Sequence, residues 1–152
     1  MSNKIRATIN EIGGRKKYEI IKYVISRYNK SIEENYFLEA IALIESLICD
    51  RLESRLGELS KKNVKLDTLG GVLKKLKVFE NDSELLKLML EIEEWSKFRN
   101  IAIHESAKIE LGDEKNFKQF LNQANATALK GKNIFNKLNK RIKKIRSKRF
   151  TQ

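Results

Sequence analysis

Proline is absent from this sequence of 152 residues, and cysteine and histidine each occur once. Without proline, helices can be interrupted only where glycine, asparagine, aspartate and serine gather. The single cysteine, Cys49, excludes an internal disulfide and a cysteine zinc site, and it favours a reducing, cytoplasmic location. One histidine without a cysteine cluster is also a poor transition-metal site, so we expect neither a metal nor a cofactor.

Long apolar runs are missing as well. No stretch approaches the roughly 18 residues that a membrane-spanning helix needs, and the N-terminus has no apolar signal-peptide region. The chain is 41% hydrophobic and 34% charged, which is typical of a globular protein, and its length suits one domain with its own core. We therefore expect a single domain over residues 1–152 and no membrane partner.

The positive charge of the chain is concentrated at one end. The net charge is +12, and residues 130–149 hold ten lysines and arginines and no acid, which leaves about +2 elsewhere. Such an excess favours a polyanionic partner. An anionic membrane is the weaker choice because this segment has few large apolar anchors. Residues 130–152 are predicted to form a basic C-terminal helix or tail, and residues 1–14, which end in two glycines, an N-terminal arm.

Apolar residues recur at helical spacing through most of the chain. The spacing predicts helices over residues 15–29, from 31 or 35 to 59, from 68 to 76 or 79, after 81–83 through residue 104, and from about 113 onward. Asn81, Asp82 and Ser83 supply capping groups for the fourth helix. We therefore predict an all-α fold, a helical bundle of four to five helices.

Two of these helices carry testable details of packing. Gly131 lies on the apolar stripe of the last helix, where it either admits a close helix crossing or marks a break before the basic end. The first helix is predicted to turn one stripe toward the core, formed by Tyr18, Ile21, Ile25 and Tyr28.

Glu45 falls on the apolar stripe of the second helix, where a hydrophobic residue would be expected. One interpretation is that Glu45 leans outward beside Ile44. The other is that it faces Arg99 across the bundle, because a buried carboxylate needs a cationic partner.

The only histidine, His104, lies five residues after Arg99 in the string Arg99-Asn100-Ile101-Ala102-Ile103-His104. On an ideal helix a five-residue step turns about 500°, which leaves the two side chains about 140° apart. We therefore expect either a bend in the helix or a site that is shared with a second protomer. The structural interpretation is that Arg99 pairs with a glutamate while His104 bonds to a loop carbonyl.

An Arg–Asn–x–x–x–His string in a small, basic, all-helical protein resembles the signature of the HEPN family (higher eukaryotes and prokaryotes nucleotide-binding domains). The resemblance covers these six residues and implies a HEPN-like bundle that acts as a metal-independent endoribonuclease, with a cleft shared across a homodimer. It also implies a role as a toxin, held by a separate antitoxin that is often nucleotidyltransferase-like, or as an effector of anti-phage defence.

The residue types suit that chemistry. When the RNA 2′-hydroxyl attacks the adjacent phosphate, the reaction needs a proton acceptor, a proton donor and a cation for the developing charge. His104 fits proton transfer and Arg99 fits the cation, while Asn100 would orient the histidine or a phosphate oxygen and Glu45 would hold Arg99. One histidine cannot be acid and base at once, so two copies of His104 in a homodimer would complete the site.

The basic end offers a surface for RNA. Its charges recur at three- and four-residue steps and carry little aromatic interleaving, so they are predicted to grip phosphates rather than read bases. They could instead be a solvated charge run, and the protein could be a non-catalytic module that binds RNA, a nucleotide or a partner protein. The predicted RNA-binding residues are Lys137, Lys140, Arg141, Lys144 and Lys148.

Overall fold

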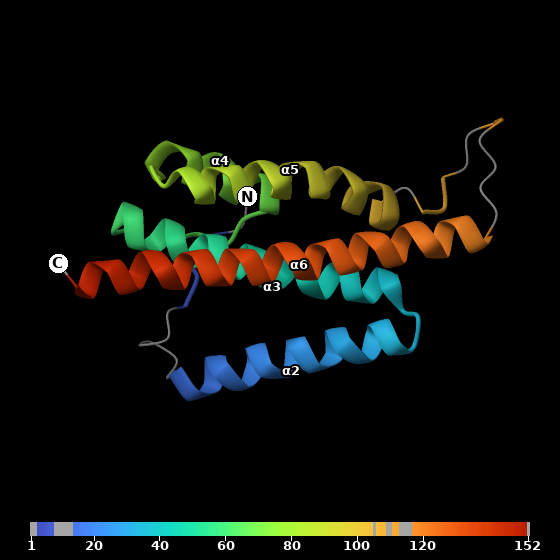
Figure 1. Ribbon diagram of the computed structural model, residues 1–152, viewed down its shortest axis with the longest axis horizontal. Helices are drawn as coiled ribbons and strands as arrows, with labels where there is room; N and C mark the ends of the chain where they lie inside the picture. The colour runs from blue at the N-terminus through green and yellow to red at the C-terminus, as the bar shows by residue number, and fades with distance from the viewer. Residues whose placement is uncertain (1–2, 8–13, 105, 109–110, 113–116, 152) are drawn as a thin grey trace.

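The computed structural model describes residues 3–7, 14–104, 106–108, 111–112 and 117–151. These residues form five α-helices and one isolated antiparallel bridge, between Ile5 and Lys65. The prediction of an all-α bundle of four to five helices is therefore confirmed (Figure 1). The helices are α2 (Gly14–Glu33), α3 (Phe37–Ser60), α4 (Leu69–Phe79), α5 (Ser83–His104) and α6 (Phe117–Phe150).

Helix α3 is the centre of the bundle, and it contacts α2, α4, α5 and α6. Figure 1 shows α2 on one side of α3 and the α4–α5 pair on the other, with α6 running along the length of α3. Each buried leucine or isoleucine contributes about 1.5–3 kcal/mol, so this shared interior holds the helices in place. Its largest fully buried side chains are Ile41, Ile44, Ile48, Leu52, Leu69, Leu73, Leu76, Leu85, Met89, Ile92, Ile134 and Leu138.

The ends of the helices follow local capping chemistry. Asp82 Oδ1 accepts a hydrogen bond from the backbone N–H of Leu85 at 2.9 Å, which starts α5 where the predicted capping cluster lies. Thr68 does the same for α4 by accepting from the N–H of Gly71 at 3.2 Å. Lys61 ends α3 in the left-handed conformation, with φ of 54°.

Gly131 marks a close crossing of helices, and α6 continues past it without a break to Phe150. A Cβ atom at this position would lie 2.8 Å from Cγ2 of Ile44 and 2.8 Å from Cζ2 of Trp95. Glycine is therefore required for α6 to lie against both α3 and α5 at this level.

The first turn of α2 departs from the predicted stripe. Tyr18 is exposed, whereas Lys17 is buried and its Nζ lies 2.9 Å from Oδ1 of Asp50 on α3. Consecutive helical residues point about 100° apart, so turning Lys17 toward Asp50 turns Tyr18 toward solvent. The rest of the stripe packs as predicted, with Ile21 and Ile25 partly buried and Tyr28 fully buried.

The described part of the N-terminal arm, residues 3–7, packs against the α3–α4 connection. The N–H of Arg6 donates to the carbonyl of Val64 at 2.7 Å, and its guanidinium Nη2 donates to Asp50 Oδ1 at 2.9 Å. Burial disfavours the ionised Asp50, but hydrogen bonds from Arg51 and Lys17 hold the pKa of Asp50 down at about 2. Asp50 thus links the arm to α2 and α3.

In the described part of the chain no helix is long and apolar enough to cross a bilayer.

Candidate functional site

Arg99 lies on the side of α5 that faces α3, with only 14% of its side chain exposed. Its Nη2 lies 3.0 Å from Oε1 of Glu45, and its Nη1 lies 3.4 Å from Nε2 of His104. Glu45 therefore pairs with Arg99 within one chain, as the second interpretation of its position predicted. The guanidinium joins an acid of α3 to the exposed histidine at the end of α5.

The expected separation of Arg99 and His104 is wrong. Helix α5 runs as an α-helix from Ser83 through His104, yet the two side chains meet within one chain. The 140° offset describes the directions of the Cα–Cβ bonds, and the long arginine side chain spans it. Neither a bend in the helix nor a second protomer is needed to bring these two groups together.

The contact between Nη1 of Arg99 and Nε2 of His104 is a hydrogen bond in one form of the histidine. A guanidinium can only donate hydrogen bonds, so Nε2 accepts only in the neutral tautomer of His104 that carries its proton on Nδ1. At 3.4 Å the bond is long and therefore weak. His104 is exposed, and its imidazole lies beside a permanent cation.

The ion pair with Arg99 does not fully offset the effect of burial on the Glu45 carboxyl group. Burial raises the pKa of Glu45, and the positive charge of Arg99, together with that of His104 when it is protonated, offsets the rise only in part. One turn further along α3, burial together with the charges of Glu45 and Glu53 raises the pKa of the Cys49 thiol to about 12. Cys49 is therefore a neutral thiol near pH 7 and a poor nucleophile.

The cluster has unused hydrogen-bonding capacity. Nε of Arg99 is buried and has no hydrogen-bond partner among the described residues. The side chain of Asn100 is exposed, and no described residue bonds to it. A buried donor without a partner costs about 1–3 kcal/mol, so Glu45 and His104 do not satisfy Arg99 fully.

A search of the residues described by the structure found no group of three or more histidine, cysteine, aspartate or glutamate side chains placed to hold a metal ion.

The five predicted RNA-binding residues fall into two groups. Arg141 Nε donates to Asp82 Oδ1 at 2.9 Å, and Lys137 Nζ lies 3.3 Å from Glu91 Oε2, so an acid just before α5 and an acid of α5 hold these two cations. Their ion pairs form because this face of α6 borders α5, and RNA binding by the five residues stays a prediction. The remaining three are exposed and form no ion pair with any described residue, and they are Lys140, Lys144 and Lys148.

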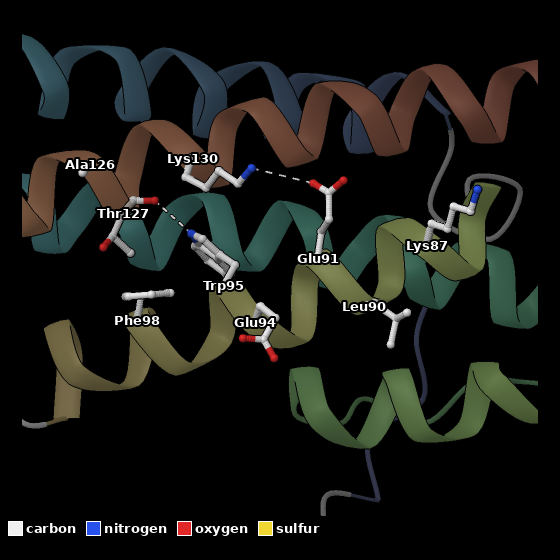
Figure 2. Close-up of a pocket in the computed structure, with 9 residues that line it drawn as sticks. All are labelled: Lys87, Leu90, Glu91, Glu94, Trp95, Phe98, Ala126, Thr127 and Lys130. Atoms are coloured by element: carbon white, nitrogen blue, oxygen red, sulfur yellow. Dashed lines mark hydrogen bonds and ion pairs between the residues drawn. The ribbon is translucent and has the colours of Figure 1, made fainter. Parts of the chain in front are cut away.

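Sequence patterns did not predict the groove between α5 and α6. It has a volume of about 540 Å³, and Figure 2 shows Leu90 and Phe98 of α5 beside it. Nε1 of Trp95 donates to the carbonyl of Thr127 at 2.9 Å and closes the floor. The signal that could have indicated the groove is the presence of Leu90 and Phe98 outside the buried stripe of α5, where both are exposed. The groove is lined by Lys87, Leu90, Glu91, Glu94, Trp95, Phe98, Ala126, Thr127 and Lys130.

No model of a known protein family matches this chain, and no curated protein or solved structure matches it either. The likeness to the HEPN family is therefore confined to the motif from Arg99 to His104.

Proposed function

We propose that this protein is a metal-independent endoribonuclease that uses Arg99, Asn100, His104 and Glu45. The observation that supports it best is the Arg99 guanidinium, which contacts Glu45 and the exposed His104 at 3.0 and 3.4 Å in one chain. In the proposed reaction the 2′-oxygen of RNA bonds to the adjacent phosphorus and the bond to the 5′-oxygen breaks. The products are a 2′,3′-cyclic phosphate and a 5′-hydroxyl.

Each residue has a defined task in this scheme. Nε2 of neutral His104 takes the proton of the 2′-hydroxyl. Arg99 exchanges its weak contact with His104 for the phosphate oxygens, and its charge stabilises the phosphorane. Glu45 keeps the guanidinium in place, and the exposed Asn100 orients a phosphate oxygen or the imidazole.

The leaving 5′-oxygen needs a proton, which we assign to a second, protonated His104 in a homodimer. Helix α5 exposes Phe98, Ile101 and His104 at three-residue steps. Leu90, eight residues before Phe98, is exposed as well. Pairing of two such faces would cover the apolar side chains and bring two histidines together. Light scattering at micromolar concentration tests this: a fully active monomer would contradict the shared cleft.

The cell biology follows from the HEPN-like motif alone. We propose a cytoplasmic effector, either a toxin restrained by a separate nucleotidyltransferase-like antitoxin or a component of anti-phage defence. The neighbouring reading frame distinguishes these roles, because a nucleotidyltransferase gene there favours the toxin and a defence locus favours the second role.

A second candidate is a non-catalytic module that binds RNA, a nucleotide or a partner protein. The α5–α6 groove favours a protein partner, since most of its exposed surface is apolar. Incubation of the purified protein with total RNA in EDTA separates the two candidates. We expect the wild-type protein to fragment RNA and Arg99→Ala and His104→Ala proteins to leave it intact, whereas equal results for all three favour the binding module.

A further inference from the structure

The groove between α5 and α6 is as long as about three turns of a helix. Along α5 its lining runs from Lys87 to Phe98, a step of eleven residues that spans about 16 Å. Figure 2 shows Phe98 and Lys87 toward opposite ends, with Trp95 between them. Leu90 and Phe98 are 57% and 60% exposed, so the wall that α5 supplies is apolar and accessible.

The two polar side chains at the floor of this groove already donate to protein groups. Nε1 of Trp95 donates to the carbonyl of Thr127 at 2.9 Å, and Oγ1 of Thr127 donates to the carbonyl of Gln123 at 2.8 Å. A nucleotide base or a polar small molecule buried here would lose hydrogen bonds with water, and both donors of the floor are in use. Apolar side chains have no such cost, so the groove suits the apolar face of another protein.

The charged side chains at the rim of the groove carry more positive than negative charge. Nζ of Lys130 and Nζ of Lys137 lie 3.8 and 3.3 Å from Oε2 of Glu91, so two cations share one carboxylate. Lys87 is exposed and forms no ion pair with a described residue. Three lysines and one glutamate therefore leave a net charge of +2.

Glu94, the other acid of the rim, does not change this excess. Its Oε1 lies 2.7 Å from Nζ of Lys97, so these two side chains form a neutral pair. An acidic segment of a partner is therefore complementary to the rim, whereas a basic segment would meet Lys87 and the shared cations around Glu91.

We propose that the α5–α6 groove binds an acidic amphipathic helix of a separate protein. The apolar face of that helix lies in the groove against Leu90 and Phe98, and its acidic residues lie beside Lys87 and Lys130. Apolar residues at i, i+4, i+7 and i+11 of such a helix match the length of the groove. The groove would hold this helix whether or not the chain cleaves RNA.

The groove overlaps in part with the face of α5 proposed for the homodimer. Leu90 and Phe98 belong to both surfaces, so the docked helix and a second copy of this chain compete. Only this competition rests on the proposed function, and it lets the partner protein control the pairing of two His104 side chains. Ile101 distinguishes the two surfaces, because it belongs to the dimer face and does not line the groove.

The test uses two synthetic peptides of about 18 residues, with leucines at i, i+4, i+7 and i+11 and either glutamates or lysines on both sides of that stripe. Calorimetric titrations should show the glutamate peptide binding at least about tenfold more tightly than the lysine peptide. Phe98→Ala should weaken binding of the glutamate peptide at least about tenfold, since aromatic anchors carry much of the energy of an interface. Lys87→Glu should weaken it about fivefold or more, because an exposed ion pair is replaced by repulsion.

Two variants serve as controls for these losses. Lys22→Glu makes the same change of charge on α2, which lies across α3 from α5 (Figure 1), and should bind the glutamate peptide like the wild type. Ile101→Ala should bind it at least as tightly as the wild type, because this change weakens only the competing dimer.

Several results would overturn the docking site. They are equal affinities of the wild type for the two peptides, an undiminished affinity of Phe98→Ala, and a loss in Ile101→Ala as large as the loss in Phe98→Ala. A 2′-O-methylated oligouridylate whose binding depends on Phe98, together with no binding of the glutamate peptide, would assign the groove to RNA instead.

Light scattering with and without the glutamate peptide tests the competition separately. We expect the saturating peptide to convert the homodimer into monomers. A chain that is monomeric without the peptide, or a dimer that persists with the peptide bound, would contradict the pairing of two α5 faces. In either case the calorimetric results still decide whether the groove binds the acidic helix.

Discussion

Two of the arginine–glutamate pairs that join α3 to its neighbours are built differently, namely Arg55–Glu80 and Arg99–Glu45. The guanidinium of Arg55 donates two hydrogen bonds to Glu80, of 2.7 and 3.0 Å, and only 5% and 1% of these side chains are exposed. Glu80 also accepts the N–H groups of Asn81 and Asp82. Arg99 makes one ion-pair contact with Glu45, which is 23% exposed.

The electrostatics of the two glutamates differ in the same sense. Burial opposes ionisation of Glu80, but the hydrogen bonds from Arg55 and from the backbone outweigh it and lower the pKa of Glu80. At Glu45 burial prevails and raises the pKa despite Arg99 and His104. A pair whose donors and acceptors are saturated stabilises the fold, whereas an arginine with donors left over can bind an anion. We assign the first role to Arg55 and the second to Arg99.

The largest effect is expected on cleavage. Arg99→Ala and His104→Ala should each lower the rate at saturating RNA by about 10²–10³-fold or more, because they remove charge stabilisation and proton transfer. Circular dichroism should show that both proteins remain folded. Lys97→Ala, which removes an exposed cation from the same helix, is the matched control and should cleave normally. An Arg99→Ala protein with the wild-type rate would remove the distinction between the two pairs.

The opposite pattern is expected at the structural pair. Arg55→Ala leaves the carboxylate of Glu80 buried without its cation, which should cost about 3–5 kcal/mol of unfolding free energy in urea titrations. Arg99→Ala should cost about 1 kcal/mol, because Glu45 is partly hydrated and loses a single contact. Equal losses of stability would show that both pairs are structural.

A smaller effect is expected for Glu45→Gln. The substitution releases Arg99 from its position, so cleavage should fall about tenfold. A fully buried Glu45 would make the change cost about 3 kcal/mol, but Glu45 is partly exposed and burial disfavours its ionised form, so we expect less than about 1 kcal/mol. An unchanged cleavage rate would show that Glu45 does not position Arg99.

The two glutamates should also give opposite dependences on pH. The raised pKa of Glu45 means that its contribution to stability is full below its unfolded pKa and is lost as the pH rises through its folded pKa. The lowered pKa of Glu80 means that its contribution is present above its unfolded pKa and is lost as the pH falls through its folded pKa. Urea titrations of Glu45→Gln and Glu80→Gln across the acidic range should therefore diverge from the wild type in opposite directions.

The smallest effect on turnover is expected from the basic helix. Replacing Lys140, Lys144 and Lys148 by glutamine should weaken RNA binding similarly for every sequence, and should flatten the salt slope by about 0.7 per phosphate contact on a single strand. Turnover at saturating RNA should stay close to that of the wild type. Lys137→Gln is the control, because Lys137 already forms an ion pair with Glu91. Equal affinities of the triple variant and the wild type at low salt would show that the lysines serve only solubility.

Helix positions were predictable because apolar periodicity and capping residues are local properties. Asp82 at the start of α5 and the unbroken stripe of α6 are examples. The rotation of α2 at Tyr18 was not predictable, because it depends on Lys17 reaching Asp50, thirty-three residues away.

The candidate site was predictable as a set of residues but not as a geometry. The sequence indicated Arg99 and His104 as one site and left open whether Glu45 faces Arg99, and the ideal-helix angle ignored the length of the arginine side chain. Likewise, spacing placed Arg141 on the RNA-binding face, because spacing could not show that Asp82 lies opposite. Side-chain reach and partners on neighbouring helices decide such cases.

The central claim is that Arg99, His104 and Glu45 cleave RNA through its 2′-hydroxyl. The most direct measurement uses an oligodeoxynucleotide with one ribonucleotide, placed in a sequence that the protein cuts in total RNA, with products identified by mass spectrometry in EDTA. We predict that the wild-type protein cuts after the ribonucleotide and leaves a 2′,3′-cyclic phosphate and a 5′-hydroxyl, and that folded His104→Ala protein leaves the strand intact. Equal cleavage by both proteins, or cleavage of the all-deoxy strand, would contradict the claim.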